Sequence, residues 1–174
     1  MGIRIVIDST SDVTKDIIEK HNLIMVPLTV NFEDGCYLDK VELTTDEFFD
    51  KLKKSQKLPT TSQASPAAFA EVFKKILDEG DEVLGIFIGS ELSGTYESAV
   101  MAKEMIGDNR IHIIDSRSAC LGTFSLIVKA VEMVEENNDI KEIVETLERV
   151  KHKVEIVADI DTLKYLEKGG RLSK

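Results

Sequence analysis

The 174-residue chain contains no tryptophan, three prolines and two cysteines. The small number of cysteines excludes two classes of protein. Cys36 and Cys120 stand alone, so neither a disulfide framework nor a zinc site is predicted. His21, His112 and His152 lack metal-ligand spacing to one another or to the cysteines, and no metal site is expected. No apolar run approaches the ~20 residues of a membrane-spanning helix, and the amino terminus lacks a signal-peptide pattern. We therefore expect a cytoplasmic protein without an integral membrane segment.

Positive charge is scarce as well. The chain has 22 lysines and arginines against 32 aspartates and glutamates, for a formal net charge of −10. Binding of nucleic acid through its phosphates requires a basic face, so no nucleic-acid partner is expected. The hydrophobic content of 43% and the charged content of 31% are typical of a globular protein. The length allows one domain with a substantial core.

Strand-like and helix-like segments alternate along the chain. Short β-branched runs predict strands at residues 3–8, 23–32, 82–88, 110–115 and 154–160. Amphipathic segments predict helices at residues 12–21, 45–55, 66–78, 121–137 and 139–152, with a further helix that ends near residue 106. This alternation predicts an α/β fold, a three-layer α/β/α domain around a largely parallel sheet.

Local signals refine several of these boundaries. Ser11 is placed to cap the first helix, Thr44–Glu47 has the pattern of a capping box, and Ser65–Pro66 is a cap followed by a first-turn proline. Pro27 predicts an edge, a bulge or a strand start within the second strand. Residues 36–39 are expected to pair back on that strand as a hairpin.

Serine and threonine gather in four loops: residues 8–12, 59–66, 89–95 and 115–118. In parallel α/β sheets ligands bind beyond the carboxyl ends of the strands, and the amino ends of helices favour anions. For any single loop, ordinary helix capping is the favoured interpretation. Capping needs only one hydroxyl per helix, however, so the surplus in loops 59–66 and 89–95 favours a functional role.

Three chemistries could use this surplus. A serine nucleophile needs a base, but the segment after residue 88 lacks the G-x-S-x-G spacing and no histidine follows in a triad layout. A nucleotide site needs a Walker A or G-x-G-x-x-G loop, and neither occurs. Neutral hydroxyl donors on two loops suit a single carboxylate. A serine-dependent hydrolase or acyltransferase that uses Ser93 remains the alternative, and an interaction module without a ligand is a third possibility.

Six ordered blocks of the sequence resemble the DegV family of bacterial fatty-acid-binding proteins: IVIDSTSDV (5–13), VPLTV (26–30), TTSQASPAAF (60–69), GSELSGTYESA (89–99), IIDSRSACLG (113–122) and LKYLEKGGRLS (163–173). The resemblance covers essentially the whole chain. It implies a carrier, not an enzyme, that binds one long-chain fatty acid, such as palmitate, and needs no cofactor. It also implies a partner, a separate fatty acid kinase that converts the presented carboxylate to acyl phosphate for phospholipid synthesis.

The family motifs also imply which residues bind the carboxylate. The matching positions are Thr61 and Ser62 in the first loop, Ser93 and Gly94 in the second, and Arg171 in the GGRLS block. Family members continue with a second α/β lobe after this block. The resemblance therefore implies a DegV-like lobe over residues 1–160 and the start of a second lobe over residues 161–174.

One residue departs from the family pattern. Glu91 stands where an SSGLSGT-like loop has no acid, and it should weaken anion binding unless its side chain points to solvent. Apolar residues near the loops are candidates for tunnel lining, although core packing is the favoured interpretation for each: Phe69, Phe73, Ile86, Ile88 and Leu92.

Overall fold

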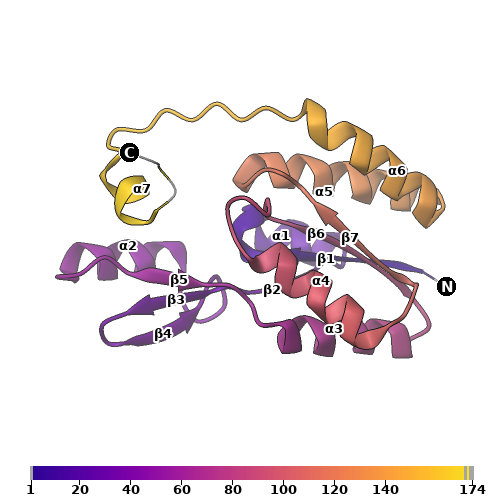
Figure 1. Cartoon of the computed structure of the whole chain (residues 1–174), viewed down its shortest axis with the longest axis horizontal. Coiled ribbons are helices and arrows are strands. Elements are labelled where there is room, and N and C mark those ends of the chain that lie inside the picture. The colour runs from indigo at the N-terminus through magenta and orange to yellow at the C-terminus, as the bar shows by residue number, and fades with distance from the viewer. Residues whose placement is uncertain (1, 171, 173–174) are drawn as a thin grey trace.

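The computed structural model of the chain describes residues 2–170 and residue 172, and within them the strands form two sheets (Figure 1). The parallel sheet has the order β2-β1-β6-β7, with β1 at Ile3–Asp8, β2 at Ile24–Val26, β6 at Glu82–Phe87 and β7 at Ile111–Asp115. The antiparallel sheet has the order β4-β3-β5, with β3 at Thr29–Phe32, β4 at Gly35–Leu38 and β5 at Thr60–Ser62. The helices are α1 (Lys15–Lys20), α2 (Thr45–Lys54), α3 (Pro66–Asp78), α4 (Thr95–Ile106), α5 (Cys120–Glu135), α6 (Ile140–Val150) and α7 (Lys164–Lys168).

Helices cover both faces of the parallel sheet. Along β1, Ile5 and Ile7 pack in a core with α1, α5 and α6, whereas Val6 packs in a second core with α3 and α4. This alternation follows from the two-residue period of a strand. The sheet is therefore the middle of three layers, as the β-branched runs predicted, and the three-layer α/β/α fold is confirmed.

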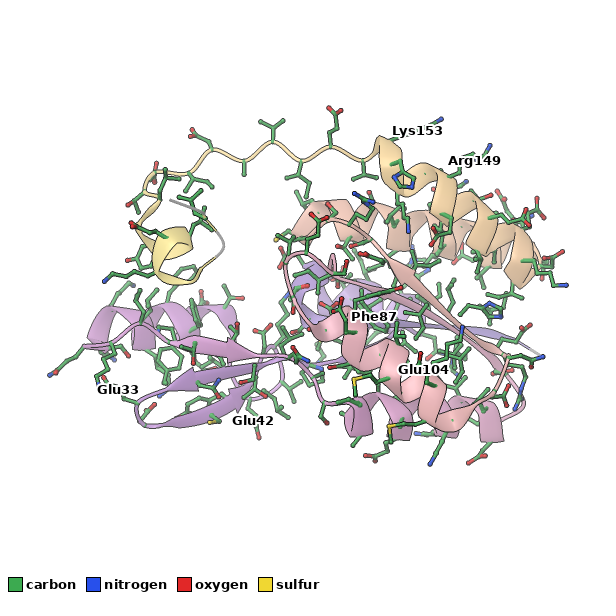
Figure 2. The ribbon with its side chains drawn as sticks, viewed as in Figure 1. Glu33, Glu42, Phe87, Glu104, Arg149 and Lys153 are labelled. Atoms are coloured by element: carbon green, nitrogen blue, oxygen red, sulfur yellow. The ribbon has the colours of Figure 1, made fainter. Side chains whose placement is uncertain are left out.

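The core on the α3 and α4 side is built around Phe87. Its side chain is fully buried, and its ring centroid lies 4.9 Å from that of Phe69 in an edge-to-face arrangement. A Cβ atom on Gly85 would lie 2.5 Å from Phe87 Cε2, so the glycine makes room for the ring. Figure 2 shows Phe87 in the interior of the layers, with Glu33 and Glu104 on the outside.

Two of the three predicted caps are confirmed. Thr44 and Glu47 form a complete capping box at the start of α2, and Ser65 Oγ accepts a hydrogen bond from the Ala68 N–H at the start of α3. The prediction for Ser11 is wrong. Residues 9–11 form a short 3-10 helix, and Ser11 Oγ donates to the Asp8 carbonyl, so α1 begins only after Thr14.

The single strand that the sequence predicted at residues 23–32 is two strands in the structure, β2 and β3. Pro27 separates β2 from β3, which belong to different sheets. The predicted hairpin is confirmed, since β4 pairs antiparallel with β3. The polar segment 57–66 also contains a short strand, β5, which pairs with the other edge of β3.

The predicted strand at residues 154–160 is wrong. This segment is not a strand; it runs from the end of α6 across to α7 (Figure 1). Val157 in its middle is 97% exposed. A β-branched sequence becomes a strand only beside a hydrogen-bonded neighbour, and none of the described strands lies beside this segment.

Candidate functional site

The carboxyl edge of the parallel sheet contains a buried carboxylate. The chain passes from β1 to β2 on one side and later to β6 on the other, so the strand order reverses between β1 and β6, where α/β proteins bind ligands. Asp8 is fully buried at this point, and its Oδ2 accepts a hydrogen bond from the Ile88 N–H at 2.8 Å. Its Oδ1 accepts from the Thr10 N–H and the Thr10 hydroxyl. The protein's own carboxylate therefore fills the crevice between these strands.

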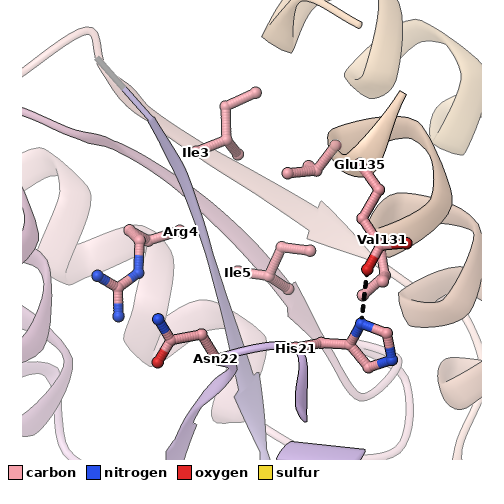
Figure 3. A pocket seen from close by; sticks show the side chains of 8 residues that line it. Ile3, Arg4, Ile5, His21, Asn22, Val131 and Glu135 are labelled. Carbon is pink, nitrogen blue, oxygen red and sulfur yellow. Dashed lines mark hydrogen bonds and ion pairs between the residues drawn. The ribbon is translucent and has the colours of Figure 1, made fainter. Parts of the chain in front are cut away.

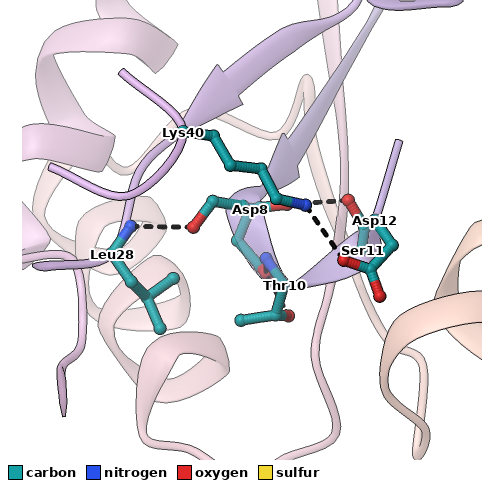
Figure 4. A network of polar contacts seen from close by, with 7 residues as sticks. Asp8, Thr10, Ser11, Asp12, Leu28 and Lys40 are labelled. Atoms are coloured by element: carbon teal, nitrogen blue, oxygen red, sulfur yellow. Dashed lines mark hydrogen bonds and ion pairs between the residues drawn. The ribbon is translucent and has the colours of Figure 1, made fainter. Parts of the chain in front are cut away.

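Burial dominates the electrostatics of Asp8. The loss of water raises the pKa of this carboxyl above its usual value of 3.8, although hydrogen bonds from Thr10 and Ile88 oppose the shift. Lys40 reaches the same region and forms an ion pair with Asp12 at 3.0 Å (Figure 4). Because Lys40 follows β4 and Asp12 follows β1, this pair ties the antiparallel sheet to the parallel one.

The loop after β6 is held by the loop after β7. Ser90 donates its N–H and its hydroxyl to the two carboxylate oxygens of Asp115, at 3.1 and 2.6 Å. A Cβ atom on Gly89 would lie 2.9 Å from the Ser118 nitrogen, so the two loops approach closely at this glycine. Ser93 lies at the end of the loop, and its Oγ is 2.9 Å from the Thr95 hydroxyl. These contacts hold Ser93 in a fixed position at the amino end of α4.

The second serine- and threonine-rich loop begins in β5. Ser62 Oγ accepts a hydrogen bond from Asn31 Nδ2 at 2.9 Å, across the β3–β5 pair. Successive side chains of a strand point to opposite faces, so Thr61 points away from the face that carries Ser62 and Asn31. Thr61 instead lines a groove beside α2. The two neighbouring candidates therefore present their hydroxyls to different surroundings.

Two cavities meet at the end of α7. The larger, a groove of about 1200 Å³, lies between α2, β5 and α7 and is lined by apolar side chains that include Phe48, Leu52 and Tyr165. The smaller, of about 460 Å³, is lined by residues 90–94 and by Gly169 and Gly170. Gly169 lines both cavities. An apolar groove therefore adjoins a polar cavity at the amino end of a helix.

The predicted site residues are distributed over these features. Ser93 and Gly94 line the smaller cavity, Thr61 lines the groove, and Ser62 lies on the opposite face of β5. Arg171 lies outside the described residues. A role in carboxylate binding stays a prediction for all of them. Sequence reasoning missed Gln63, whose amide contacts Gly94 and Ser98 and so joins the two loops.

Glu91 is exposed, and it lines the smaller cavity beside Ser93. The five apolar candidates for tunnel lining differ in their burial. Core packing accounts for Phe69, Phe73 and Ile86, which are buried within the two cores. Ile88 is also buried, whereas Leu92 is exposed and lines the smaller cavity.

Within the described residues, the side-chain hydrogen bonds of Ser93 are to Thr95. Its Oγ pairs with the hydroxyl of Thr95 and accepts from the Thr95 N–H. His21 lies at the opposite end of β1, in a cavity of about 150 Å³, where its Nδ1 is 2.8 Å from Glu135 (Figure 3). His112 lies near the start of β7 and faces Glu82. Neither of these two histidines is a hydrogen-bond partner of Ser93.

The geometry can be compared with known proteins. A family profile described as "Uncharacterised protein, DegV family" matches residues 2–174. The chain belongs to the DegV family. A DegV domain-containing protein from Caldanaerobacter subterraneus is 43% identical over 99% of this chain and 61% of its own length. One from Clostridium perfringens is 36% identical over 99% of this chain and 62% of its own length. The resemblance seen in the six sequence blocks is confirmed.

Solved structures of DegV proteins share the fold. A fatty-acid-binding DegV protein from Thermus thermophilus has a TM-score of 0.87 and 36% identity, and the match covers 98% of this chain and 61% of that one. A stearic-acid-binding protein from Eubacterium ventriosum has a TM-score of 0.84 and 31% identity over 98% of this chain and 60% of that one. The chain thus spans about three-fifths of the length of these DegV relatives. Within the described residues, no helix is long and apolar enough to cross a membrane.

Proposed function

We propose that this DegV chain binds one long-chain fatty acid, with the carboxylate at the amino end of α4 and the hydrocarbon chain in the groove between α2, β5 and α7. The observation that carries the proposal is the junction of the two cavities at Gly169, where an apolar groove meets the cavity of Ser93 and Gly94. The fatty-acid-binding DegV protein from Thermus thermophilus and the stearic-acid-binding protein from Eubacterium ventriosum support it.

The amino end of α4 suits an anion for two reasons. The first N–H groups of a helix have no intrahelical acceptor, and the helix dipole adds partial positive charge there. Ser93 accepts hydrogen bonds at Oγ from the Thr95 N–H and, in one arrangement of the hydroxyl protons, from Thr95 Oγ1. In that arrangement the Ser93 hydroxyl proton is free to donate to a carboxylate.

The hydrocarbon chain supplies most of the affinity. A tail of about 15 carbons buried at ~0.8 kcal/mol each gives roughly 12 kcal/mol before the entropic costs of binding. Phe49 lines the groove and is 51% exposed, so its ring is available to a ligand. The groove therefore sets how tightly the ligand binds, and the hydroxyl groups set which end lies at α4.

The bound fatty acid is carried and not converted by this chain. Nothing in the contacts of Ser93 supplies a general base, so a fluorophosphonate probe should leave Ser93 unlabelled. We propose that a separate kinase phosphorylates the presented carboxylate for phospholipid synthesis. Labelling of Ser93 by the probe would contradict the carrier role and support the hydrolase.

Native mass spectrometry of the chain purified from bacteria tests the ligand itself. The expected spectrum contains a bound mass equal to that of a long-chain fatty acid, and protein without any such mass contradicts the proposal. Ser93→Ala should weaken binding by about 1–2 kcal/mol, roughly 5- to 30-fold, because one hydrogen bond to a charged group is lost. Ser125→Ala is the matched control, since Ser125 lies on α5 and its hydroxyl donates to the Gly122 carbonyl of the same helix.

A second pair of variants tests the groove. Phe49→Ser should weaken palmitate binding roughly 30-fold, because about 2 kcal/mol of apolar contact is lost. Met105→Ser is the control, since Met105 is an exposed apolar residue on α4 at a distance from both cavities. Equal affinities for the two variants would show that the tail lies elsewhere.

A further inference from the structure

Gly94 is a glycine for a reason other than backbone conformation. Its φ of −70° and ψ of 8° are accessible to any residue, so no left-handed turn requires it. A Cβ atom at this position would instead lie 2.1 Å from Gln63 Oε1 and 2.9 Å from Gln63 Cδ. The absence of a side chain on Gly94 makes room for the amide of Gln63.

The other end of the same amide is also engaged. Gln63 Nε2 donates a hydrogen bond to Ser98 Oγ at 2.8 Å. Ser98 lies in the first part of α4 and is only 1% exposed. A buried hydroxyl without a partner is costly, so this bond fastens Gln63 to the helix. One side chain therefore contacts both the residue before α4 and a residue within its first turn.

These contacts fix the distance between the two hydroxyl-rich loops. Gln63 directly follows Ser62 in the chain, and Gly94 directly follows Ser93. The first loop starts in the antiparallel sheet and the second starts in the parallel sheet, so their relative position depends on the contacts between them. Gln63 supplies such a contact one residue away from a predicted ligand-binding hydroxyl in each loop.

We infer that Gln63 is a positioning residue of the fatty-acid site, a latch that holds the β5–α3 loop against the amino end of α4 before the ligand arrives. The inference rests on the proposed function. The Nε2 of Gln63 donates to Ser98 and its Oε1 occupies the space that a side chain on Gly94 would take, so Gln63 acts through the loops that it joins. A site that is ordered in advance avoids the entropic cost of ordering two loops on binding.

A double-mutant cycle tests the latch. Palmitate affinity is measured on the fatty-acid-stripped 174-residue chain for Gln63→Ala, Gly94→Ala and the double variant. Each single variant should bind palmitate about tenfold more weakly, because either the amide or the space for it is lost. In the double variant no amide remains to clash with the new Cβ, so Gly94→Ala should then add less than about twofold.

Thermal unfolding and a control separate the latch from a general structural role. Gln63→Ala leaves the buried Ser98 hydroxyl without this partner, so the unfolding midpoint should fall by a few degrees while palmitate affinity falls about tenfold. Ser98→Ala removes the same hydrogen bond and should lower palmitate affinity as well if the bond positions the loop. Asn109→Ala, which removes an exposed amide just before β7, should change neither quantity. A fall in the midpoint without a fall in affinity would assign Gln63 to folding and overturn the latch.

The outcomes of the cycle also distinguish this inference from the proposed function. If the stripped wild type binds palmitate and the two effects simply add, Gln63 and Gly94 act independently and the latch is wrong, although fatty-acid binding stands. If the wild-type chain stripped of fatty acid binds no palmitate, the proposed function is wrong, and the positioning role of Gln63 is then wrong as well.

Discussion

The buried carboxyl of Asp8 provides a test of the carboxyl edge that does not depend on any ligand. Replacement by asparagine keeps the size of the side chain and removes its charge. Asp8 accepts three hydrogen bonds, two from Thr10 and one from the Ile88 N–H. An asparagine has one amide oxygen, which can accept from either Thr10 or Ile88. Its NH₂ group then faces the N–H donor on the other side and cannot accept from it. One buried bond is lost, and the free energy of unfolding should fall by about 1–3 kcal/mol.

The pH dependence of this loss carries a specific sign. Burial raises the pKa of Asp8 above its usual value of 3.8, so the folded protein holds the proton more tightly than the unfolded chain does. The resulting stabilisation is complete below about pH 3.8 and is lost as the pH rises through the raised pKa of the folded state. Asp8→Asn cannot titrate at this position. The stability of the wild type minus that of Asp8→Asn should therefore decline as the pH increases.

Urea unfolding of both proteins from about pH 3 to about pH 8 measures this difference. Asp159→Asn, an exposed carboxyl in the segment between α6 and α7, corrects for the removal of one negative charge. A difference that increases with pH would mean that the three hydrogen bonds outweigh burial and lower the pKa of Asp8 in the folded protein. That result would refute the account of the crevice between β1 and β6.

Two further variants probe the core and the smaller cavity. Gly85→Ala should lower the free energy of unfolding by about 1–3 kcal/mol, because the new Cβ meets the ring of Phe87 in a filled core. An unchanged urea midpoint would show that the ring can move aside. Glu91→Gln should tighten palmitate binding about twofold at low salt, since unit charges about 8 Å apart in water repel by about 0.5 kcal/mol. The gain should disappear near 1 M salt, where the Debye length is about 3 Å; equal affinities at low salt would place Glu91 away from the carboxylate.

The parallel sheet could be predicted because its signals are local. Runs of β-branched residues mark strands buried on both faces, and the caps at Thr44 and Ser65 mark helix starts. The antiparallel sheet could be predicted only in part. β5 is a short polar segment whose identity as a strand comes from its pairing with β3, far away in sequence. The segment at residues 154–160 shows the reverse case, since its strand-like sequence has no partner in the described structure.

The candidate site was predictable at the level of loops and not of side chains. Counting hydroxyl groups identified the loops that contain Ser62 and Ser93. The loop of Ser93 lines the smaller cavity, and the loop of Ser62 contacts α4 through Gln63. The count could not show that Thr61 and Ser62 point to opposite faces, which follows from the register of β5 on β3. Nor could it find Gln63, whose importance depends on the space left by Gly94.

Several hydroxyl groups near this edge of the parallel sheet are used within the protein. Ser9 accepts from the Leu28 N–H, Ser11 donates to Asp8, and Ser98 accepts from Gln63. The serines in these three contacts are buried and therefore closed to a ligand. The contacts of Ser9 and Ser98 join segments that are far apart in the sequence, whereas that of Ser11 lies within one loop. Ser93 differs because it is partly exposed and lines a cavity. The buried hydroxyl groups therefore hold this edge together, and Ser93 at its surface is the hydroxyl that we propose binds the carboxylate.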